Sequence, residues 1–257
     1  GTNHEKERKK ILNIFINCYF YQNKSLPVIR HSRYLLPLLI LLLLASGCKR
    51  FRTLPEEMEG DYILYQVEYL EEKAGDIPTH LLPGTLEAYY TRNHIATSID
   101  GFFGQFSLVQ IANLRKKQVT TLLNFFGNKI YYTGERHELP AGIRPIDDPM
   151  ISYTSDTMNF SGLLAQRAII ATPDTSFDIF FTKEIDIREP NITTPYHSID
   201  YVLCDFRVQL SQLKMRLTLD KHERKMIDTD IFTIPGEYEQ VSRATMEKII
   251  NSLFTKE

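Results

Sequence analysis

The sequence predicts a mainly β domain (α+β class), with a single antiparallel sheet and a C-terminal helix packed on it. Short stretches of alternating aromatic and β-branched residues recur between turn residues along positions 60–232, as half-buried strands require. A helical spacing of apolar residues follows only after Ser242. No internal repeat or long linker divides this region, so we expect one β-rich domain over residues 60–257.

Residues 1–47 have the composition of a leader and a signal peptide. The uncharged run LLPLLILLLLA at 35–45 follows Arg30 and Arg33 and ends in small residues. At about 1.5 Å per helical residue such a run spans roughly 16 Å, short of a bilayer core of about 30 Å. A secretory signal is therefore favoured over a transmembrane helix.

The end of this run resembles the lipobox of bacterial lipoproteins, because Ser46 and Gly47 precede Cys48. Ala45 departs from the Leu that the family most often has there. The resemblance implies that the Cys48 thiol carries a diacylglyceryl anchor, followed by a polar tether, over residues 48–59. Lys49 favours the outer membrane of a Gram-negative envelope under the same family's sorting rules. The alternative is an ordinary signal peptide in which Cys48 is incidental.

The strands of the first half are expected at residues 62–69, 85–91, 95–99 and 106–111. A hairpin is expected at 119–126 and 129–133, because Gly127-Asn128 suits a two-residue turn with positive φ. A second hairpin is expected at 163–171 and 177–185, around a turn at 173–176. Three further strands are expected at 201–210, 215–219 and 225–232. Loops with Pro or Gly lie at 73–84, 139–149 and 188–195.

The C-terminal segment has the pattern of an amphipathic helix. Ser242 is a good N-cap residue, and an apolar stripe follows it at helical spacing. The stripe consists of Met246, Ile249, Ile250, Leu253 and Phe254.

Adjacent aromatic pairs are the most informative pattern within the strands. They are Tyr89-Tyr90, Phe102-Phe103, Phe125-Phe126, Tyr131-Tyr132 and Phe180-Phe181. Neighbouring strand residues point to opposite faces, so both faces of the sheet are apolar in places. Either loops and the helix cover both faces, or one face holds a ligand or a partner. In the second case Phe125 or Phe126, and Tyr131 or Tyr132, are our candidates to line a shared apolar pocket beside the helix.

The residue chemistry gives no sign of catalysis. A formal net charge of −2 argues against nucleic acid as a main partner. No phosphate loop and no Gly-x-Ser-x-Gly elbow occurs. The histidines lack paired spacing and are expected at the surface, the acids Asp147-Asp148, Asp228 and Asp230 are expected in solvent, and Cys204 is expected to be buried. We therefore assign no catalytic residue, metal or cofactor, and expect a protein that is not an enzyme.

Several short motifs resemble a family of Gram-negative lipoproteins of unknown function, whose fold is similar to that of the lipoprotein carriers of the Lol pathway. They are Gly60-Asp61-Tyr62, Phe160-Ser161-Gly162 with Ala168, and the segments 180–185 and 232–238. The resemblance implies a strongly curved sheet, a half-barrel, with helices across its concave side. Two departures are the lack of an evident helix before residue 163 and the presence of Cys204 where a Gly or an apolar residue is expected.

The expected function follows from the anchor and the curved sheet. A lipoprotein held at the envelope through Cys48 would bind a lipid, an acyl chain or another lipoprotein in an apolar concavity. The first alternative is a structural or interaction lipoprotein that docks an envelope protein. A hydrolase is a more remote one.

Overall fold

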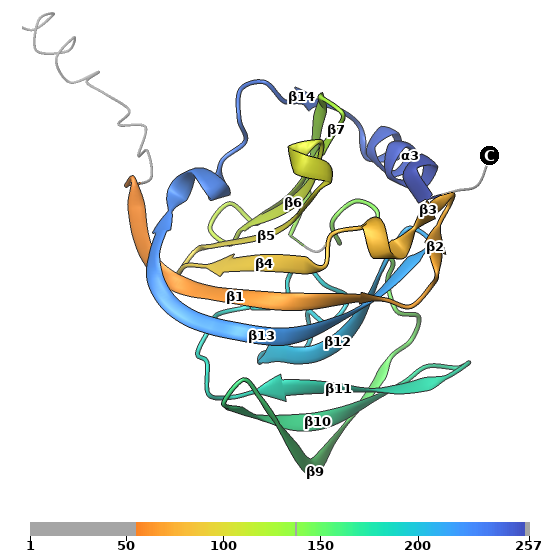
Figure 1. Cartoon of the computed structure of the whole chain (residues 1–257). Helices are drawn as coiled ribbons and strands as arrows, with labels where there is room; N and C mark the ends of the chain where they lie inside the picture. Colours follow the sequence, from red (N-terminus) through yellow and green to blue (C-terminus); the bar gives the residue numbers. More distant parts are fainter. Residues whose placement is uncertain (1–54, 137, 255–257) are drawn as a thin grey trace, which may run out of the picture. The chain divides into compact units, whose positions relative to one another are not determined.

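The computed structural model describes residues 55–136 and 138–254, which belong to one compact unit beginning at Leu54. Its main feature is one sheet of 12 strands in the order β14-β8-β7-β6-β5-β4-β1-β13-β12-β11-β10-β9 (Figure 1). All neighbours pair antiparallel except β14 and β8, which are parallel. The predicted leader, signal peptide and Cys48 lie outside the described residues.

The strands of the first half are β1 (Glu57–Tyr69), β4 (Thr85–Tyr90), β5 (His94–Gly101), β6 (Phe106–Asn113), β7 (Gln118–Phe125) and β8 (Asn128–Glu135). Those of the second half are β9 (Met150–Phe160), β10 (Leu163–Ala171), β11 (Ser176–Thr182), β12 (Val202–Leu210), β13 (Leu213–Asp228) and β14 (Glu239–Gln240). A small hairpin of β2 (Lys73–Ala74) and β3 (Ile77–Pro78), three 3-10 turns, η1 (Thr79–Leu81), η2 (Phe102–Gly104) and η3 (Thr229–Phe232), and the helix α3 (Arg243–Phe254) complete the described elements.

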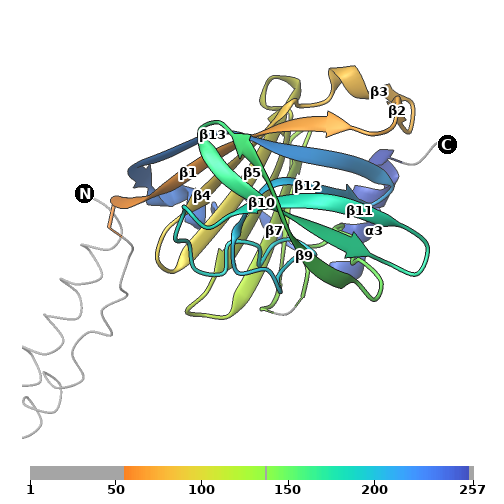
Figure 2. The same cartoon turned by 90° about the horizontal axis from the view of Figure 1, so that it is seen from below.

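The sheet curls upon itself without closing, which confirms the predicted curved antiparallel sheet. Strands β9–β12 lie beneath β4–β8 in Figure 1 and in front of them in Figure 2. Side chains of the two halves meet in the interior, where Leu108 of β6 and Leu217 of β13 line the same cavity. The core of the domain is this concave side, and it is formed by residues far apart in the sequence.

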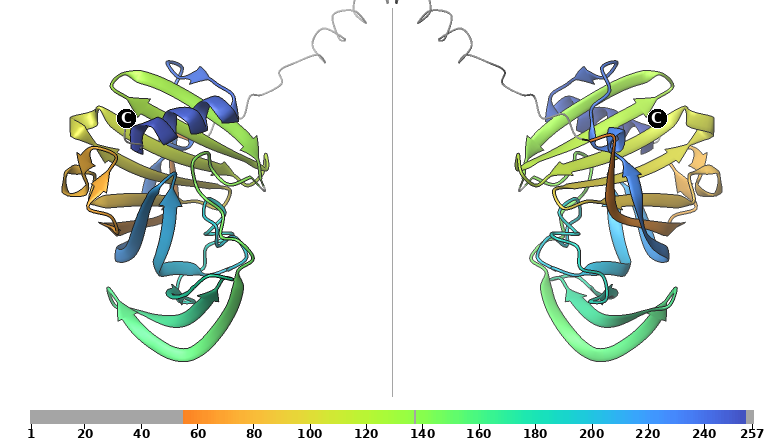
Figure 3. Two further views of the ribbon diagram at one scale, coloured as in Figure 1. Left: turned by 90° about the vertical axis from the view of Figure 1, so that its right-hand side faces the viewer. Right: turned by 90° about the vertical axis from the view of Figure 1, so that its left-hand side faces the viewer.

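Helix α3 begins as predicted, because the Oγ of Ser242 accepts a hydrogen bond from the backbone N–H of Thr245 at 3.2 Å. It lies across β8 (Figure 3). Met246, Ile250 and Phe254 are buried on its inner face. At Gly142 (φ 86°) an added Cβ would lie 3.0 Å from side-chain atoms of both Ile250 and Leu210. The helix therefore closes the opening between the two halves of the curved sheet.

The convex side of β5–β7 is covered by the chain itself. Ala96, Ile111 and Leu122 form a second apolar cluster with Ile227 and Phe232. The segment that carries Ile227 and Phe232 therefore folds back over the outer face. Both faces of this half of the sheet are covered by loops and by α3, which is the first of the two arrangements expected from the aromatic pairs.

Three strand predictions are corrected by the structure. The two strands expected at 215–219 and 225–232 are one strand, β13, which continues to Asp228 and passes into η3. A β-bulge opposite Leu64 and Tyr65 absorbs Asp220, so polar residues interrupt the alternation without ending the strand. The unpredicted strand β9 is exposed along most of its length and therefore shows no alternation. Strand β1 begins at Glu57, within the predicted tether.

The β7–β8 hairpin turns one residue earlier than predicted. Phe125 pairs with Asn128, so the central residues are Phe126 (φ 48°) and Gly127 (φ 84°). This register places Phe125 on the apolar interior, whereas a shift by one residue would turn it outward. The side chain of Asn124 supports the turn by accepting a hydrogen bond from Gly127 N at 3.2 Å.

Candidate functional site

The four residues predicted to line a pocket do not share one, although the rings of Phe125 and Phe126 are in edge contact with centroids 4.8 Å apart. Phe125 and Tyr132 face the concave side, where Phe125 lines a cavity of about 30 Å³, and Tyr131 packs in the convex cluster. Phe126 stands in the hairpin turn with 65% of its surface exposed. The Tyr132 hydroxyl donates to Glu138 at 2.9 Å, and burial with this contact raises the pKa of Tyr132. The shared pocket is therefore not formed by these residues.

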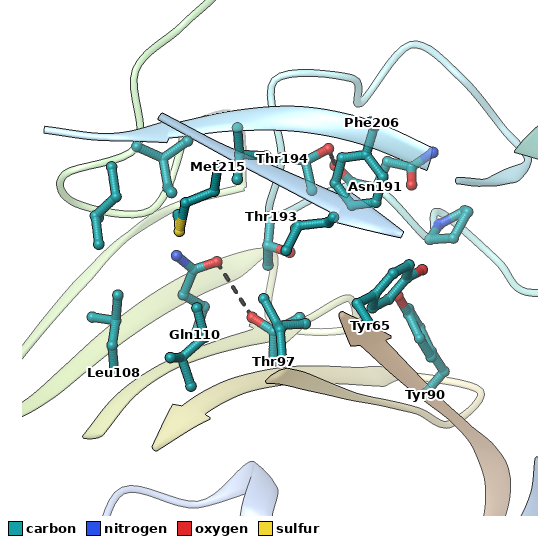
Figure 4. A pocket seen from close by; sticks show the side chains of 17 residues that line it. Tyr65, Tyr90, Thr97, Leu108, Gln110, Asn191, Thr193, Thr194, Phe206 and Met215 are labelled. Atoms are coloured by element: carbon teal, nitrogen blue, oxygen red, sulfur yellow. Dashed lines mark hydrogen bonds between the residues drawn. The ribbon is translucent and has the colours of Figure 1, made fainter. Parts of the chain in front are cut away.

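The concave interior is nearly filled by its own side chains. Two cavities among its described residues have volumes of about 50 and 30 Å³. On that measure a water needs about 10–15 Å³, whereas ligand pockets reach about 300–1,000 Å³. The larger cavity (Figure 4) carries polar groups, and Thr97 donates to Gln110 Oε1 at 3.4 Å. It suits a few waters better than an acyl chain.

Larger hollows lie where β11 and β12 part. The ladder between these strands covers only the pairs from Phe180–Asp205 to Thr182–Val202. Before Phe180 and beyond Asp205 the strands diverge, as Figure 1 shows toward the end at which β11 begins. Two adjoining hollows open at this place, of about 270 and 350 Å³, and they share Phe177 and Arg207. These hollows are the candidate site.

The smaller hollow, which we name the cationic hollow, gathers Arg144, Arg207 and Lys214. None of its lining residues is acidic. Among the ion pairs of the described residues, none involves these three side chains. The remaining lining is mostly apolar: Leu70, Pro145, Ile146, Thr175, Phe177, Pro195, Tyr196, Val208 and Gln209. Three positive charges thus converge over an apolar floor.

Backbone contacts hold the three cations in place. Arg144 N donates to Gln209 O at 2.9 Å, which ties the loop after β8 to β12. The buried Tyr196 hydroxyl donates to the carbonyl of Arg207 at 2.6 Å, and burial raises the pKa of this phenol. Lys214 N donates to Glu71 Oε2 at 2.9 Å. The positions of the cations are therefore fixed by neighbouring elements. The Nε of Arg144 also donates to Ser211 O at 3.4 Å, and no acidic side chain of the lining neutralises any of the three cations.

The larger hollow, which we name the balanced hollow, carries equal numbers of acids and cations. It is lined by Ser176, Phe177, Asp178, Phe180, Asp205, Arg207 and Arg216. Arg216 donates to both oxygens of Asp205, at 2.8 and 2.6 Å, and these bonds raise the pKa of the guanidinium. Asp178 pairs with Arg167 at 3.1 Å. Of the four charged residues in this lining, Arg207 alone has no ion pair.

The predicted chemistry of two single residues can be compared with the structure. Cys204 is buried as predicted, and burial raises the pKa of its thiol to about 12. His94 is buried against Phe232, which corrects its predicted place at the surface.

Sequence reasoning missed the site because its cations come from a loop, from β12 and from β13. A usable signal existed in the polar positions of the predicted strands. Asp205 and Arg207 alternate on one strand, as Lys214 and Arg216 do on the next, and Arg207 lies directly opposite Arg216. Two like charges facing each other are unfavourable unless a counterion or an acid separates them.

The comparisons with known proteins do not assign the chain to a family. No family model and no curated protein matches the chain. Two solved structures of PNGF-II, in space groups C2 and P21, resemble it with a TM-score of 0.48 and 11% identity. The similarity covers 75% of this chain and 33% of the PNGF-II chain, so the chain spans about a third of that protein.

Proposed function

We propose that this chain is an envelope lipoprotein that binds an anionic amphiphile, such as a lipid with an acidic headgroup, in the cationic hollow. The observation that carries the proposal is the convergence of Arg144, Arg207 and Lys214 on one hollow without an acidic residue in its lining. In a chain with a formal net charge of −2, such a local excess of positive charge attracts anions selectively.

An amphiphile fits this hollow better than a simple anion. Leu70 keeps 42% of its surface exposed there, and Ile146 and Tyr196 continue the apolar lining. Burying apolar surface contributes about 25 cal/mol per Å², in addition to charge-assisted hydrogen bonds from the guanidinium groups. The acyl chain would lie on this outer surface, because the concave interior is already filled.

Titration of the chain with an alkyl phosphate below its micellar concentration tests the proposal. An alkyl trimethylammonium of the same chain length separates charge recognition from apolar adsorption. Binding is expected for the phosphate only, and it should weaken as salt is added. Arg144→Gln and Lys214→Gln should each weaken it about three- to ten-fold, since a typical hydrogen bond contributes roughly 0.5–1.5 kcal/mol.

Arg92→Gln provides the matched control, because Arg92 is exposed on the loop between β4 and β5 and loses the same charge. Its affinity for the alkyl phosphate should equal that of the unaltered chain. If Arg92→Gln and Arg144→Gln lowered the affinity equally, the effect would come from net charge alone. That result would overturn the proposed site.

The membrane anchor is a separate part of the proposal. Within residues 55–136 and 138–254, no helix is long and apolar enough to cross a bilayer. Cys48→Ser is expected to abolish labelling with a radioactive fatty acid and to release the chain from membranes, with Cys18→Ser as the control. Unchanged labelling of Cys48→Ser would reject the anchor without affecting the ligand site.

The edge of the sheet supports a second candidate function, the docking of an envelope protein. Strand β9 has 11 residues and is bordered by no further strand of the described sheet. Met150, Tyr153 and Met158 are exposed on it, and its single charge, Asp156, is paired with Arg167 at 3.0 Å. A neutral edge of this length can receive a partner strand. Tyr153→Lys should then abolish a complex captured by cross-linking in the envelope, and an unchanged complex would exclude this edge.

A further inference from the structure

We infer that the ligand carries a hydroxyl-rich group, of the sugar or polyol class, beside its acidic group, and that the balanced hollow holds it. This inference rests on the proposed function, since it concerns the second half of the same site. The two hollows adjoin each other at Arg207 and Phe177, which line both. A ligand whose acid is held by Arg207 therefore has its next group at the entrance of the balanced hollow.

The charges of the balanced hollow exclude a second strongly charged group. Asp178 and Asp205 are already paired with Arg167 and Arg216, so an added anion would meet two carboxylates and an added cation two guanidiniums. An uncharged group that both donates and accepts hydrogen bonds disturbs neither pair. Vicinal hydroxyls have this property, because each hydroxyl carries one donor and two acceptor lone pairs.

The floor of the balanced hollow adds an apolar contact. Phe180 is half-buried, and its ring packs against Phe160 with centroids 5.4 Å apart. Phe177 forms the border toward the cationic hollow. The C–H face of a sugar ring can rest on such aromatic side chains while its hydroxyl edge reaches Asp178, Asp205 and Arg216. A hollow of about 350 Å³ is within the size range of small-ligand pockets, about 300–1,000 Å³.

The test compares inorganic phosphate, a hexose 6-phosphate and the free hexose as ligands of the full chain. The hexose phosphate is expected to bind at least ten-fold more tightly than inorganic phosphate, and the free hexose only weakly. Ser176→Trp should remove this gain, because Ser176 lines the balanced hollow but not the cationic hollow and is exposed at the start of β11. Ser152→Trp, at an exposed position of β9, is the matched control.

A second variant protects the test against misfolding of Ser176→Trp. Asp178→Asn keeps the size of the side chain and should reduce the gain from the sugar about three-fold or more.

An alkyl ester of the hexose phosphate distinguishes a lipid headgroup from a free sugar phosphate: tighter binding of the ester assigns a lipid, and equal binding assigns the soluble compound.

The outcomes distinguish a failure of the hydroxyl-binding role from a failure of the proposed anion-binding function. If hexose phosphate and inorganic phosphate bind equally well, or if Ser176→Trp and Asp178→Asn both retain the gain, the hydroxyl-binding role is overturned while the anion site remains. If no phosphate compound binds, or if alkyl phosphate binds the Arg144→Gln chain as tightly as the unaltered chain, the proposed function itself fails.

Discussion

The guanidinium carbon of Arg207 lies 5.6 Å from the centroid of the Phe177 ring, at the place where β11 and β12 part. This contact orients the single cation that lines both hollows. A planar guanidinium on an aromatic face keeps the N–H groups at its rim available to carboxylate or phosphate. The Arg207–Phe177 contact therefore lies where the pairing of β11 and β12 ends, and it positions one of the cations that we propose for the site.

Phe177→Leu is expected to weaken alkyl phosphate binding about two- to five-fold. An exposed cation–π contact contributes about 0.5–1 kcal/mol, and its loss lets Arg207 leave the orientation that binds. Leu retains most of the apolar volume, so the melting temperature should stay close to that of the unaltered chain. Calorimetric titration measures the affinity. An unchanged affinity would show that Phe177 does not position Arg207.

The sequence allowed the antiparallel strands and the terminal helix to be predicted, because both depend on periodic burial, whereas the curvature of the sheet was expected only from the family resemblance. The β10 strand has the predicted bounds, and Ser242 caps α3 as expected. Strand β9 was missed for the opposite reason: an edge strand with solvent on both faces has no burial period. The candidate site was missed because it depends on where β11 separates from β12, which no local pattern encodes.

The predicted apolar pocket failed for a related reason. The alternation of side chains along a strand places Phe125 and Tyr131 on opposite faces of the sheet. It does not predict which other residues pack on each face. Leu210 and Ile250, distant in sequence, both approach Gly142 and belong to the interior cluster against which Phe125 packs. Packing of this kind is decided by tertiary structure alone.

The ion pair of the balanced hollow, buried at Asp205 and exposed at Arg216, should contribute measurably to stability. Asp205 is 6% exposed and accepts both hydrogen bonds of Arg216. Arg216→Gln removes the charged donor, so the free energy of unfolding should fall by about 1.5–3 kcal/mol. Arg224→Gln is the control, because its pair with Glu59 is mostly exposed and is worth roughly 0–1 kcal/mol. Urea denaturation measures both, and similar losses would show that burial of Asp205 adds nothing.

Closure by α3 should depend on Ile250. This side chain is 1% exposed and contacts the part of the core that includes Leu210. Ile250→Ala is expected to lower the free energy of unfolding by about 2–5 kcal/mol, as for large-to-small changes in other cores. Lys248→Ala, on the exposed side of the same helix, should change it by less than about 0.5 kcal/mol. Comparable effects of the two substitutions in urea would show that the helix is peripheral.

The buried histidine predicts a dependence of stability on pH. His94 is 6% exposed, its ring lies 5.5 Å from that of Phe232, and its Nδ1 has no hydrogen-bond partner. Burial lowers the pKa of His94 below 6.5, with smaller contributions from Lys116 and Arg115. The folded state therefore favours the neutral ring, while the unfolded state takes up a proton near pH 6.5. Stability from this group is complete above pH 6.5 and is lost as the pH falls toward the lowered pKa.

The free energy of unfolding should accordingly decrease between pH 6.5 and 5, by at most about 1.4 kcal/mol per pH unit for one proton. His94→Phe removes the titrating group and keeps a ring to pack on Phe232. The difference between the two urea-denaturation series isolates His94, because the contributions of all other titratable groups are common to both. This difference should widen steadily toward pH 5. Parallel curves over that window would mean that His94 is protonated equally in the folded and unfolded states, in which case its burial has no electrostatic cost.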